Sequence, residues 1–244
     1  MGKKKFTVYG ISDLHGNLLD VEYFGNGGDL LCICGDILPL DIQSDDLKSV
    51  AWFYSEFVPW CNSLPFDKII MVFGNHDFLG EHIYKKYGDY NSFFGLYGDY
   101  MSKIVILLDD VYEYKGLKIY GTSWCPDLSS WAYYKSCSGL QEKFSKLPSY
   151  CDIILSHCPI KGMVGTVLQN GNWNFMRDFG CNELTDALNG YVGQWFLCGH
   201  VHSGYHTPYQ FGNINVVNVS VLNENYEVAY SPLKFEITPL NIDK

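Results

Sequence analysis

Arginine is almost absent from this sequence of 244 residues. Arg177 is the only arginine, and lysine supplies the remaining positive charge. Lysine and arginine together number 17 against 27 aspartates and glutamates, so the formal net charge is −10. A partner that is bound through a phosphate backbone requires a broad basic surface. The composition therefore argues against an extended nucleic-acid surface.

A disulfide framework is not expected either, although the chain contains nine cysteines. Their number is odd, they are scattered along the chain, and a chain of this length does not need disulfides to stabilise it. No two of them have the C-x-x-C spacing of a thiolate zinc cluster. Several lie in apolar runs, where cysteine is usually a small core residue. We therefore expect free thiols and a reducing, cytoplasmic environment.

The sequence has no apolar run long enough to cross a bilayer, and the apolar stretch after Lys3–Lys5 is too short for a secretory signal. It also has no internal repeat, low-complexity tract or linker-like stretch. With 47% hydrophobic residues, the chain can form a substantial core. We expect residues 1–244 to form one soluble domain with no membrane partner. No feature of the sequence indicates an oligomeric state.

Short apolar runs rich in β-branched residues recur along the chain, and each predicts a buried strand. We expect these strands at Phe6–Ile11, Leu30–Cys34, Lys68–Phe73, Ile104–Leu108, Asp152–Leu155, Gln194–Cys198 and Ile214–Val219. A further pair of runs, Val111–Tyr114 and Leu117–Tyr120, is separated by Lys115-Gly116 and predicts a hairpin.

Helical patterns lie between several of these strands. Ser44 can cap a helix that buries Leu47 and that Pro59 would end. Cys137–Leu147 and Asn182–Leu188 are shorter helix candidates. Strands that alternate with helices, together with a central hairpin, favour an α/β fold. We expect a four-layer α/β/β/α sandwich of two mixed sheets flanked by helices, with a metal site at the C-terminal ends of the strands.

Polar side chains follow several of the predicted strands, at the point where each strand ends. In chain order they are Asp13, His15, Asp36, Asn75, His76, His157, His200 and His202. In open α/β sheets, ligands bind beyond the carboxyl ends of the strands, because the loops converge there while the sheet fixes their ends. We therefore expect these side chains to meet in one cleft.

The side chains other than His76 are aspartates, histidines and one asparagine, with no cysteine. Oxygen and imidazole ligands without thiolate suit manganese, iron, zinc or nickel in an open, reactive site. Taken singly, each residue has another explanation: Asp13 as a helix cap, Asp36 as a turn residue and His157 as a core histidine. Their occurrence together, each at a strand end, favours a shared metal site.

The motifs D-x-H, G-D, G-N-H-D, a lone histidine and G-H-x-H, in this order, resemble the signature of calcineurin-like metallophosphoesterases. The resemblance extends from Asp13 to His202 and implies two divalent cations. It implies that one cation is bound by Asp13, His15, Asp36 and His202. It implies that the other is bound by Asp36, Asn75, His157 and His200, so that Asp36 bridges the two. His76 would be the acid or transition-state stabiliser, oriented by Asp77.

A narrower resemblance points to the metallophosphoesterase-domain (MPPED-like) branch, whose members hydrolyse cyclic nucleotides weakly. It rests on Gly121–Trp124, Leu155–Pro159 and Gly199–Tyr205, followed by Asn218–Val221. One departure concerns the residues after Asp36, which lack the Asp-Arg pair of the protein serine/threonine phosphatases. The resemblance therefore argues against a phosphoprotein phosphatase.

These observations predict a dinuclear metal-dependent phosphoesterase with a small-molecule phosphate ester as substrate. Manganese is the first choice of metal, with iron, zinc or nickel as alternatives. Two cations can acidify a bound water and clamp the attacking and leaving oxygens, so hydrolysis needs no phospho-enzyme. A phosphomonoesterase, such as a nucleotidase or small-molecule phosphatase, is the alternative. A metal-binding scaffold without catalysis is the alternative from a different class.

The scarcity of arginine bears on the type of ester. A monoester near neutral pH is mostly a dianion, and enzymes that bind one commonly add bidentate arginine contacts to the metals. With Arg177 as the only arginine, this chain offers little additional positive charge, although Lys161 could contribute some. We therefore expect phosphodiesters, such as cyclic nucleotides, to be preferred.

Overall fold

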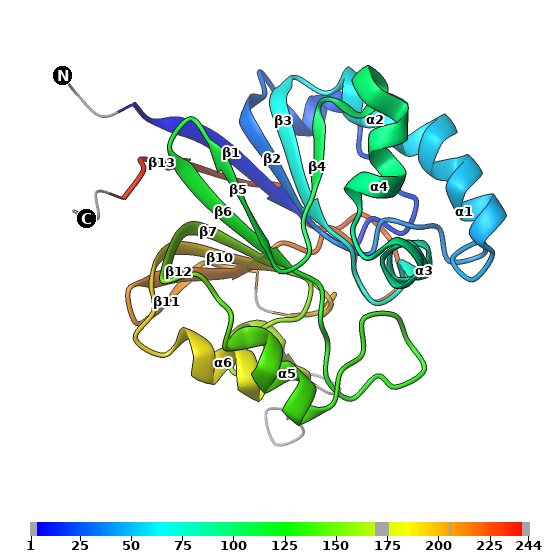
Figure 1. The fold of residues 1–244 in the computed structure, drawn as a ribbon. Coiled ribbons are helices and arrows are strands. Elements are labelled where there is room, and N and C mark those ends of the chain that lie inside the picture. Colours follow the sequence, from blue (N-terminus) through cyan, green and yellow to red (C-terminus); the bar gives the residue numbers. More distant parts are fainter. Residues whose placement is uncertain (1–3, 169–175, 205, 241–244) are drawn as a thin grey trace.

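The computed structural model of the chain describes residues 4–168, 176–204 and 206–240. Two mixed sheets pack face to face and are covered by helices on their outer sides (Figure 1). The helices of the first sheet are α1 (Asp46–Trp52), α2 (Val58–Ser63), α3 (Phe78–Tyr87) and α4 (Asn91–Phe94). Those of the second sheet are α5 (Cys137–Phe144) and α6 (Asn182–Leu188). The expected α/β/β/α sandwich is confirmed.

The first sheet has the strand order β13-β1-β2-β3-β4. These strands are β13 (Leu233–Ile237), β1 (Phe6–Ile11), β2 (Gly28–Cys34), β3 (Phe66–Val72) and β4 (Ile104–Ile106). β13 is antiparallel to β1, and the other neighbours are parallel. The carboxyl ends of β1, β2 and β3 therefore lie at the same edge of the sheet.

The second sheet has the strand order β11-β12-β10-β7-β6-β5. These strands are β11 (Tyr209–Phe211), β12 (Ile214–Asn218), β10 (Val192–Cys198), β7 (Tyr150–Ser156), β6 (Leu117–Thr122) and β5 (Asp110–Tyr114). β5 and β6 form the expected antiparallel hairpin, whereas β6, β7, β10 and β12 run parallel. A bridge between Ser12 and Ser220 joins the two sheets at the carboxyl ends of β1 and β12.

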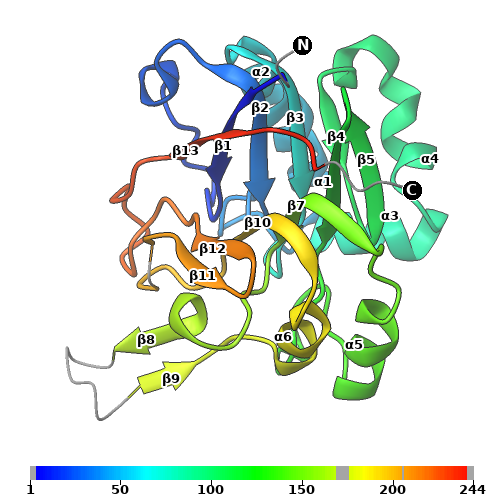
Figure 2. The ribbon, with the colours of Figure 1, turned by 90° about the vertical axis from the view of Figure 1, so that its left-hand side faces the viewer.

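A small antiparallel hairpin extends from the second sheet near this edge (Figure 2). Its strands are β8 (Thr166–Leu168) and β9 (Met176–Asp178), which the sequence pattern did not predict. Strands this short carry too few residues to show a hydrophobic period.

The apolar core has two layers. Side chains such as Val8, Ile70, Leu155 and Leu197 fill the space between the sheets, and a larger cluster lies between the sheets and the helices. All nine cysteines are free, as expected, and only Cys137 is exposed. Among the described residues, no helix is long and apolar enough to cross a membrane.

The first helix begins one residue later than expected. Asp45, not Ser44, is its cap, because the Asp45 carboxylate accepts a hydrogen bond of 3.1 Å from the N–H of Lys48. The buried face of the helix also differs from the predicted apolar face, because it includes Ser49. Leu47 is 84% exposed instead of buried.

Pro59 does not end this helix either. α1 continues through a π-helical segment, Phe53–Phe57, directly into α2. The wider π turn changes the hydrogen-bond register, so Pro59 lies in the first turn of α2, where a missing N–H is tolerated. Phe53 and Phe57 are thereby buried in the core.

Candidate metal centre

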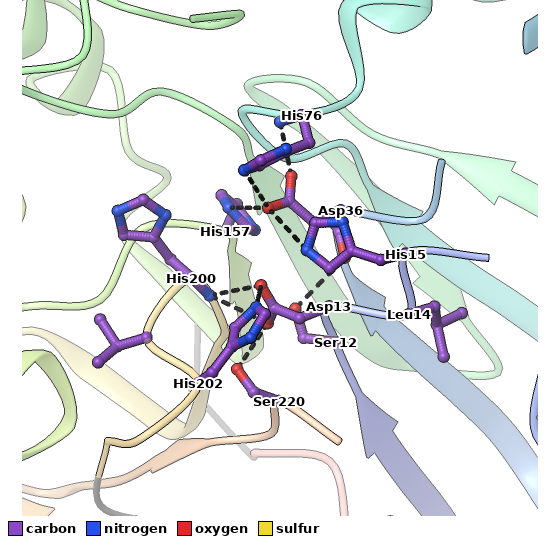
Figure 3. A network of polar contacts seen from close by, with 12 residues as sticks. Ser12, Asp13, Leu14, His15, Asp36, His76, His157, His200, His202 and Ser220 are labelled. Atoms are coloured by element: carbon purple, nitrogen blue, oxygen red, sulfur yellow. Dashed lines mark hydrogen bonds and ion pairs between the residues drawn. The ribbon is translucent and has the colours of Figure 1, made fainter. Parts of the chain in front are cut away.

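The carboxyl ends of β1, β2, β3, β7 and β10 converge at the edge where the two sheets are joined. The loops after these strands carry all the side chains that the sequence analysis assigned to the site. Figure 3 shows the imidazoles of His15, His76 and His157 beside Asp36 and that of His202 beside Asp13, whereas His200 faces Asp13 with its backbone N–H. The sequence-predicted residues are therefore brought together in one cluster.

Asp36 lies at the centre of this cluster and is almost fully buried. Its Oδ1 accepts a hydrogen bond of 2.8 Å from the backbone N–H of His76. Its Oδ2 is 3.3 Å from Nε2 of His157 and 3.7 Å from Nε2 of His15. The carboxylate thus lies between imidazoles that come from the first and the second sheet.

Asp13 is fully buried and links the two sheets. Its carboxylate accepts hydrogen bonds from the backbone N–H of His200, at 3.1 and 3.0 Å, and from the hydroxyl of Ser220, at 2.6 Å. Nε2 of His202 lies 3.5 Å from Asp13 Oδ1. His202 donates its Nδ1–H to the carbonyl of Asn223, which leaves Nε2 directed at the carboxylate.

A second group of ligand atoms gathers around Asn75. Its Oδ1 is 2.8 Å from Nε2 of His157 and 2.8 Å from Nδ1 of His200. His157 donates its Nδ1–H to the carbonyl of Cys34. A histidine bonded in this way presents its other nitrogen as a metal ligand, as in known metal sites.

His15 is 7% exposed, yet neither of its ring nitrogens has a hydrogen-bond partner among the described residues. A buried polar group without a partner costs about 1–3 kcal/mol. Asp36 and Asp13 are its acidic neighbours. An unpartnered imidazole beside two carboxylates is the arrangement expected of a ligand for a cation.

The protonation states agree with cation binding. Burial raises the pKa of Asp36, but His157 and the neighbouring imidazoles outweigh it and hold that pKa well below its usual range. The pKa of Asp13 is also lowered, against burial, by the hydrogen bond from His202 and by the charge of His157. Burial lowers the pKa of His15 to about 4. Ionised carboxylates beside a neutral imidazole are the forms that bind metals.

His157 and His200 respond differently to the same surroundings. Burial lowers the pKa of His157, but Asp36 and Asp13 reverse this and raise the pKa to about 10. Burial and the charge of His157 lower the pKa of His200 to about 4. The two buried aspartates therefore favour the protonated form of His157, and the pKa of His202 is likewise raised, against burial, by its hydrogen bond to Asp13.

Backbone strain occurs at several of the same residues. The φ angles of Asp13, His15, Asp36 and His200 are 56°, 43°, 53° and 74°, in the left-handed region that residues other than glycine rarely adopt. Such conformations cluster at functional sites. The backbone at Gly74 also approaches the Asp36 carboxylate closely. A side chain does not fit there, because a Cβ at Gly74 would lie 2.2 Å from Asp36 Oδ1.

Several groups of ligand atoms lie within 4.8 Å of one another, as binding a cation requires. These groups are Asp13 with His15 and His202, His15 with Asp36 and His76, and Asp13 with Asp36 and His157. The first contains three of the side chains expected at one cation. The second includes His76, which the sequence analysis assigned to catalysis. The residues present therefore fit divalent cations.

One expectation about the site is wrong: Asp77 does not orient His76. The Asp77 carboxylate is fully buried and accepts hydrogen bonds from the backbone N–H groups of Gly74, Ile37 and Leu38, at 2.7, 3.0 and 3.0 Å. It therefore holds the loops after β2 and β3 together. The ring of His76 is bonded elsewhere, to Gln43.

A cleft of about 450 Å³ opens above the cluster. Asp36, His76, His200 and His202 line its base. Its walls are formed by Leu128, Val167, Arg177, Phe179, Val201, Ser203, Glu224 and Tyr226. The cleft is large enough for a phosphate ester with an organic group, and it contains the only arginine of the chain.

The sequence matches the calcineurin-like phosphoesterase family over residues 6–204. The chain belongs to this family. Calcineurin-like phosphoesterases are metal-dependent hydrolases of phosphate esters, and the cluster described above supplies candidate ligands for such a metal.

Curated relatives agree with this membership, and a solved structure shows a similar fold. The chain is 27% identical over 230 residues to human metallophosphoesterase domain-containing protein 1, and the match covers 88% of this chain but 66% of the human protein. The mouse protein of the same name matches equally. Phosphopantetheinyl hydrolase from Mycobacterium tuberculosis has a similar fold, with a TM-score of 0.52 at 14% identity over 94% of this chain and 95% of the other.

Some residues of this calcineurin-like site were not singled out from the sequence. The ring of Tyr226 packs edge-on against His15 and His202, with centroids 5.0 and 5.1 Å apart. Neither Tyr226 nor Gln43 lies in a recognisable motif. Ser220 belongs to the Asn218–Val221 segment, but nothing in that segment indicates a bond to Asp13.

Proposed function

We propose that this protein is a dinuclear metal-dependent phosphoesterase that hydrolyses small phosphodiesters such as cyclic nucleotides. The observation that carries the proposal is the position of Asp36. Its Oδ2 lies 3.7 Å from His15 on one side and 3.3 Å from His157 on the other. A buried carboxylate between two sets of ligands is suited to bridge two cations.

In this proposal each cation has its own set of side chains. Asp13, His15, Asp36 and His202 bind one cation, and Asp36, Asn75, His157 and His200 bind the other. When bound, two such cations supply an acidified water and neutralise charge on the phosphoryl group. Manganese is the first candidate, and iron, zinc or nickel also suit oxygen and imidazole ligands.

In this proposal His76 is the acid or stabiliser for the leaving oxygen. Its Nε2 is 4.0 Å from Asp36 Oδ2, at the base of the cleft, and its side chain is 16% exposed. The ring of Trp131 lies over it, with centroids 4.2 Å apart, and limits the access of water. A phosphate ester held at the cluster would present its leaving oxygen to this nitrogen.

The direct test of the proposal is metal content together with turnover. Purified protein is expected to contain about two transition-metal ions per chain. Hydrolysis of bis-nitrophenyl phosphate should stop after exhaustive chelation and return when manganese is added. If the protein retains its metals but hydrolyses no phosphate ester, the alternative function, a metal-binding scaffold without catalysis, is favoured instead.

The charges in the cleft bear on the choice between diester and monoester. Among the described residues that line the cleft, Arg177 is the only arginine or lysine, and the carboxylate of Glu224 lines the same walls. Lys161 does not contribute, because its Nζ is 3.0 Å from the carbonyl of Asp178 at the base of the β8–β9 hairpin. Apart from Asp36 and the histidines at its base, the described lining of the cleft offers one cationic and one anionic side chain, which is a poor match for a dianionic monoester.

We therefore expect kcat/KM to be about tenfold or more higher for bis-nitrophenyl phosphate than for nitrophenyl phosphate, a difference of roughly 1.4 kcal/mol in transition-state stabilisation. The two esters share a leaving group, so the comparison isolates the charge on the phosphoryl group. Both rates must be measured with the same metal ion and at the same pH. A preference for the monoester would instead indicate a nucleotidase or small-molecule phosphatase.

A further inference from the structure

Gln43 lies in the turn that precedes α1 and contacts the ring of His76. Its Oε1 accepts a hydrogen bond of 2.6 Å from the Nδ1–H of His76. The two residues are 33 positions apart in the sequence, so the bond depends on how this turn packs against the loop after β3. The side chain of Gln43 is half-buried, which shields the bond from water.

The turn that carries Gln43 is held by the first turn of α1. The carbonyl of Ile42 accepts hydrogen bonds from the N–H of Asp45, at 2.8 Å, and from the hydroxyl of Ser49, at 2.9 Å. Asp45 in turn caps the helix through the N–H of Lys48. The backbone on both sides of Gln43 is therefore fixed to α1.

Two aromatic rings also contact the ring of His76. Trp131 covers one face, and the ring of His15 meets it edge-on at 4.8 Å and 86°. The loop of Trp131 is held by a hydrogen bond of 3.1 Å from the N–H of Ala132 to the carbonyl of Asn75. With Nδ1 bonded to Gln43, Nε2 is the ring nitrogen that is directed at the base of the cleft.

We infer that Gln43 is the positioning residue for His76: it keeps a proton on Nδ1 and directs Nε2 at the substrate. The inference rests on the proposed function, because it assumes that His76 acts at the leaving oxygen. An amide suits this task here. It accepts the Nδ1–H without adding a third negative charge beside Asp13 and Asp36. Asp77 is not available for the task, since both its oxygens are bonded to backbone N–H groups.

The first part of the test is a double-mutant cycle. Gln43→Met removes the acceptor at similar volume, and it is expected to reduce kcat on an alkyl phosphodiester roughly 10–100-fold, as loss of an orienting partner commonly does. The loss on a nitrophenyl ester should be smaller. In the His76→Ala background the same substitution should change kcat less than about twofold, because Gln43 acts only through the ring of His76, which this variant lacks. Metal content should not change.

The second part does not depend on activity. In zinc-loaded protein, which is diamagnetic, nitrogen-15 NMR should show His76 protonated at Nδ1, with the signal identified by its absence in His76→Ala. In Gln43→Met, His76 should no longer be held in this one tautomer. In Gln43→Glu, which keeps an acceptor oxygen, His76 should remain protonated at Nδ1. Ser44→Ala is the matched control in the same turn, since Ser44 is exposed, and it should alter neither the spectrum nor the rate.

The outcomes separate the inference from the proposed function. The inference would be overturned if Gln43→Met left both the tautomer of His76 and the rate unchanged. It would also be overturned if Gln43→Met lowered kcat by the same factor in the His76→Ala background as in the parent protein. If Gln43→Met changes the tautomer while His76→Ala leaves every rate intact, Gln43 does position the ring and the role assigned to His76 is wrong.

Discussion

Replacing Asp36 with alanine is expected to empty both cation sites and to reduce hydrolysis to the background rate. Oδ2 of Asp36 faces imidazoles from both sheets, at 3.7 Å from His15 and 3.3 Å from His157. Its removal also leaves these buried imidazoles without their counter-charge. Metal analysis of the purified variant should therefore show far fewer than the roughly two ions expected of the parent protein.

A comparison with His15→Ala makes this prediction specific. His15 belongs to one ligand set only, so its loss should weaken the binding of mainly one cation. The loss in affinity should exceed the roughly 10–100-fold that is typical when a ligand loses its hydrogen-bond partner. Asp20→Ala is the matched aspartate control, because Asp20 follows β1 but is exposed. Full activity of Asp36→Ala, or equal metal loss in all three variants, contradicts a bridging role.

His76→Ala is expected to keep its metals and to lose rate in a way that depends on the leaving group. A nitrophenolate departs without a proton, whereas a ribose alkoxide requires one. The loss in kcat should therefore reach about 10²–10⁴ on a nucleotide ester, the usual contribution of general acid catalysis. On the nitrophenyl ester it should be much smaller. The measurement is kcat for both esters in the same metal-loaded preparation.

The control for this prediction is His82→Ala. His82 is an exposed histidine on α3 whose Nδ1 lies 2.8 Å from Asp46, at the surface of the molecule. It should have the kinetics of the parent protein on both esters. Equal losses on both esters in His76→Ala would assign this residue to binding the phosphoryl group. A loss of metal would indicate that His76 is a ligand, as its place beside His15 and Asp36 allows.

Much of the fold follows from local patterns. β1 and α6 have the predicted bounds, Phe6–Ile11 and Asn182–Leu188, and the other predicted strands agree within a few residues. Strands such as β2 and β7 are largely buried on both faces, so they appear as continuous apolar runs, whereas the mostly exposed β5 was predicted from its hairpin spacing. The edge strands β11 and β13 and the β8–β9 hairpin were not predicted, because short or partly exposed strands lack such runs.

The composition of the candidate site was also accessible from the sequence, because each side chain follows a recognisable strand. Parallel neighbouring strands place their carboxyl ends together, so a polar residue at each end predicts a cluster. The structure brings Asp13, Asp36 and Asn75 together from one sheet, and His157 and His200 from the other.

The sequence by itself determined which side chains meet, and only the tertiary structure decided how they are partnered. The strand ends are set by local hydrophobicity, which short segments reveal. The bond from His76 to Gln43, the commitment of Asp77 to backbone N–H groups and the position of Arg177 at the cleft are long-range contacts. They depend on how a turn, a loop and a hairpin pack against the sheets, and no local pattern encodes that packing.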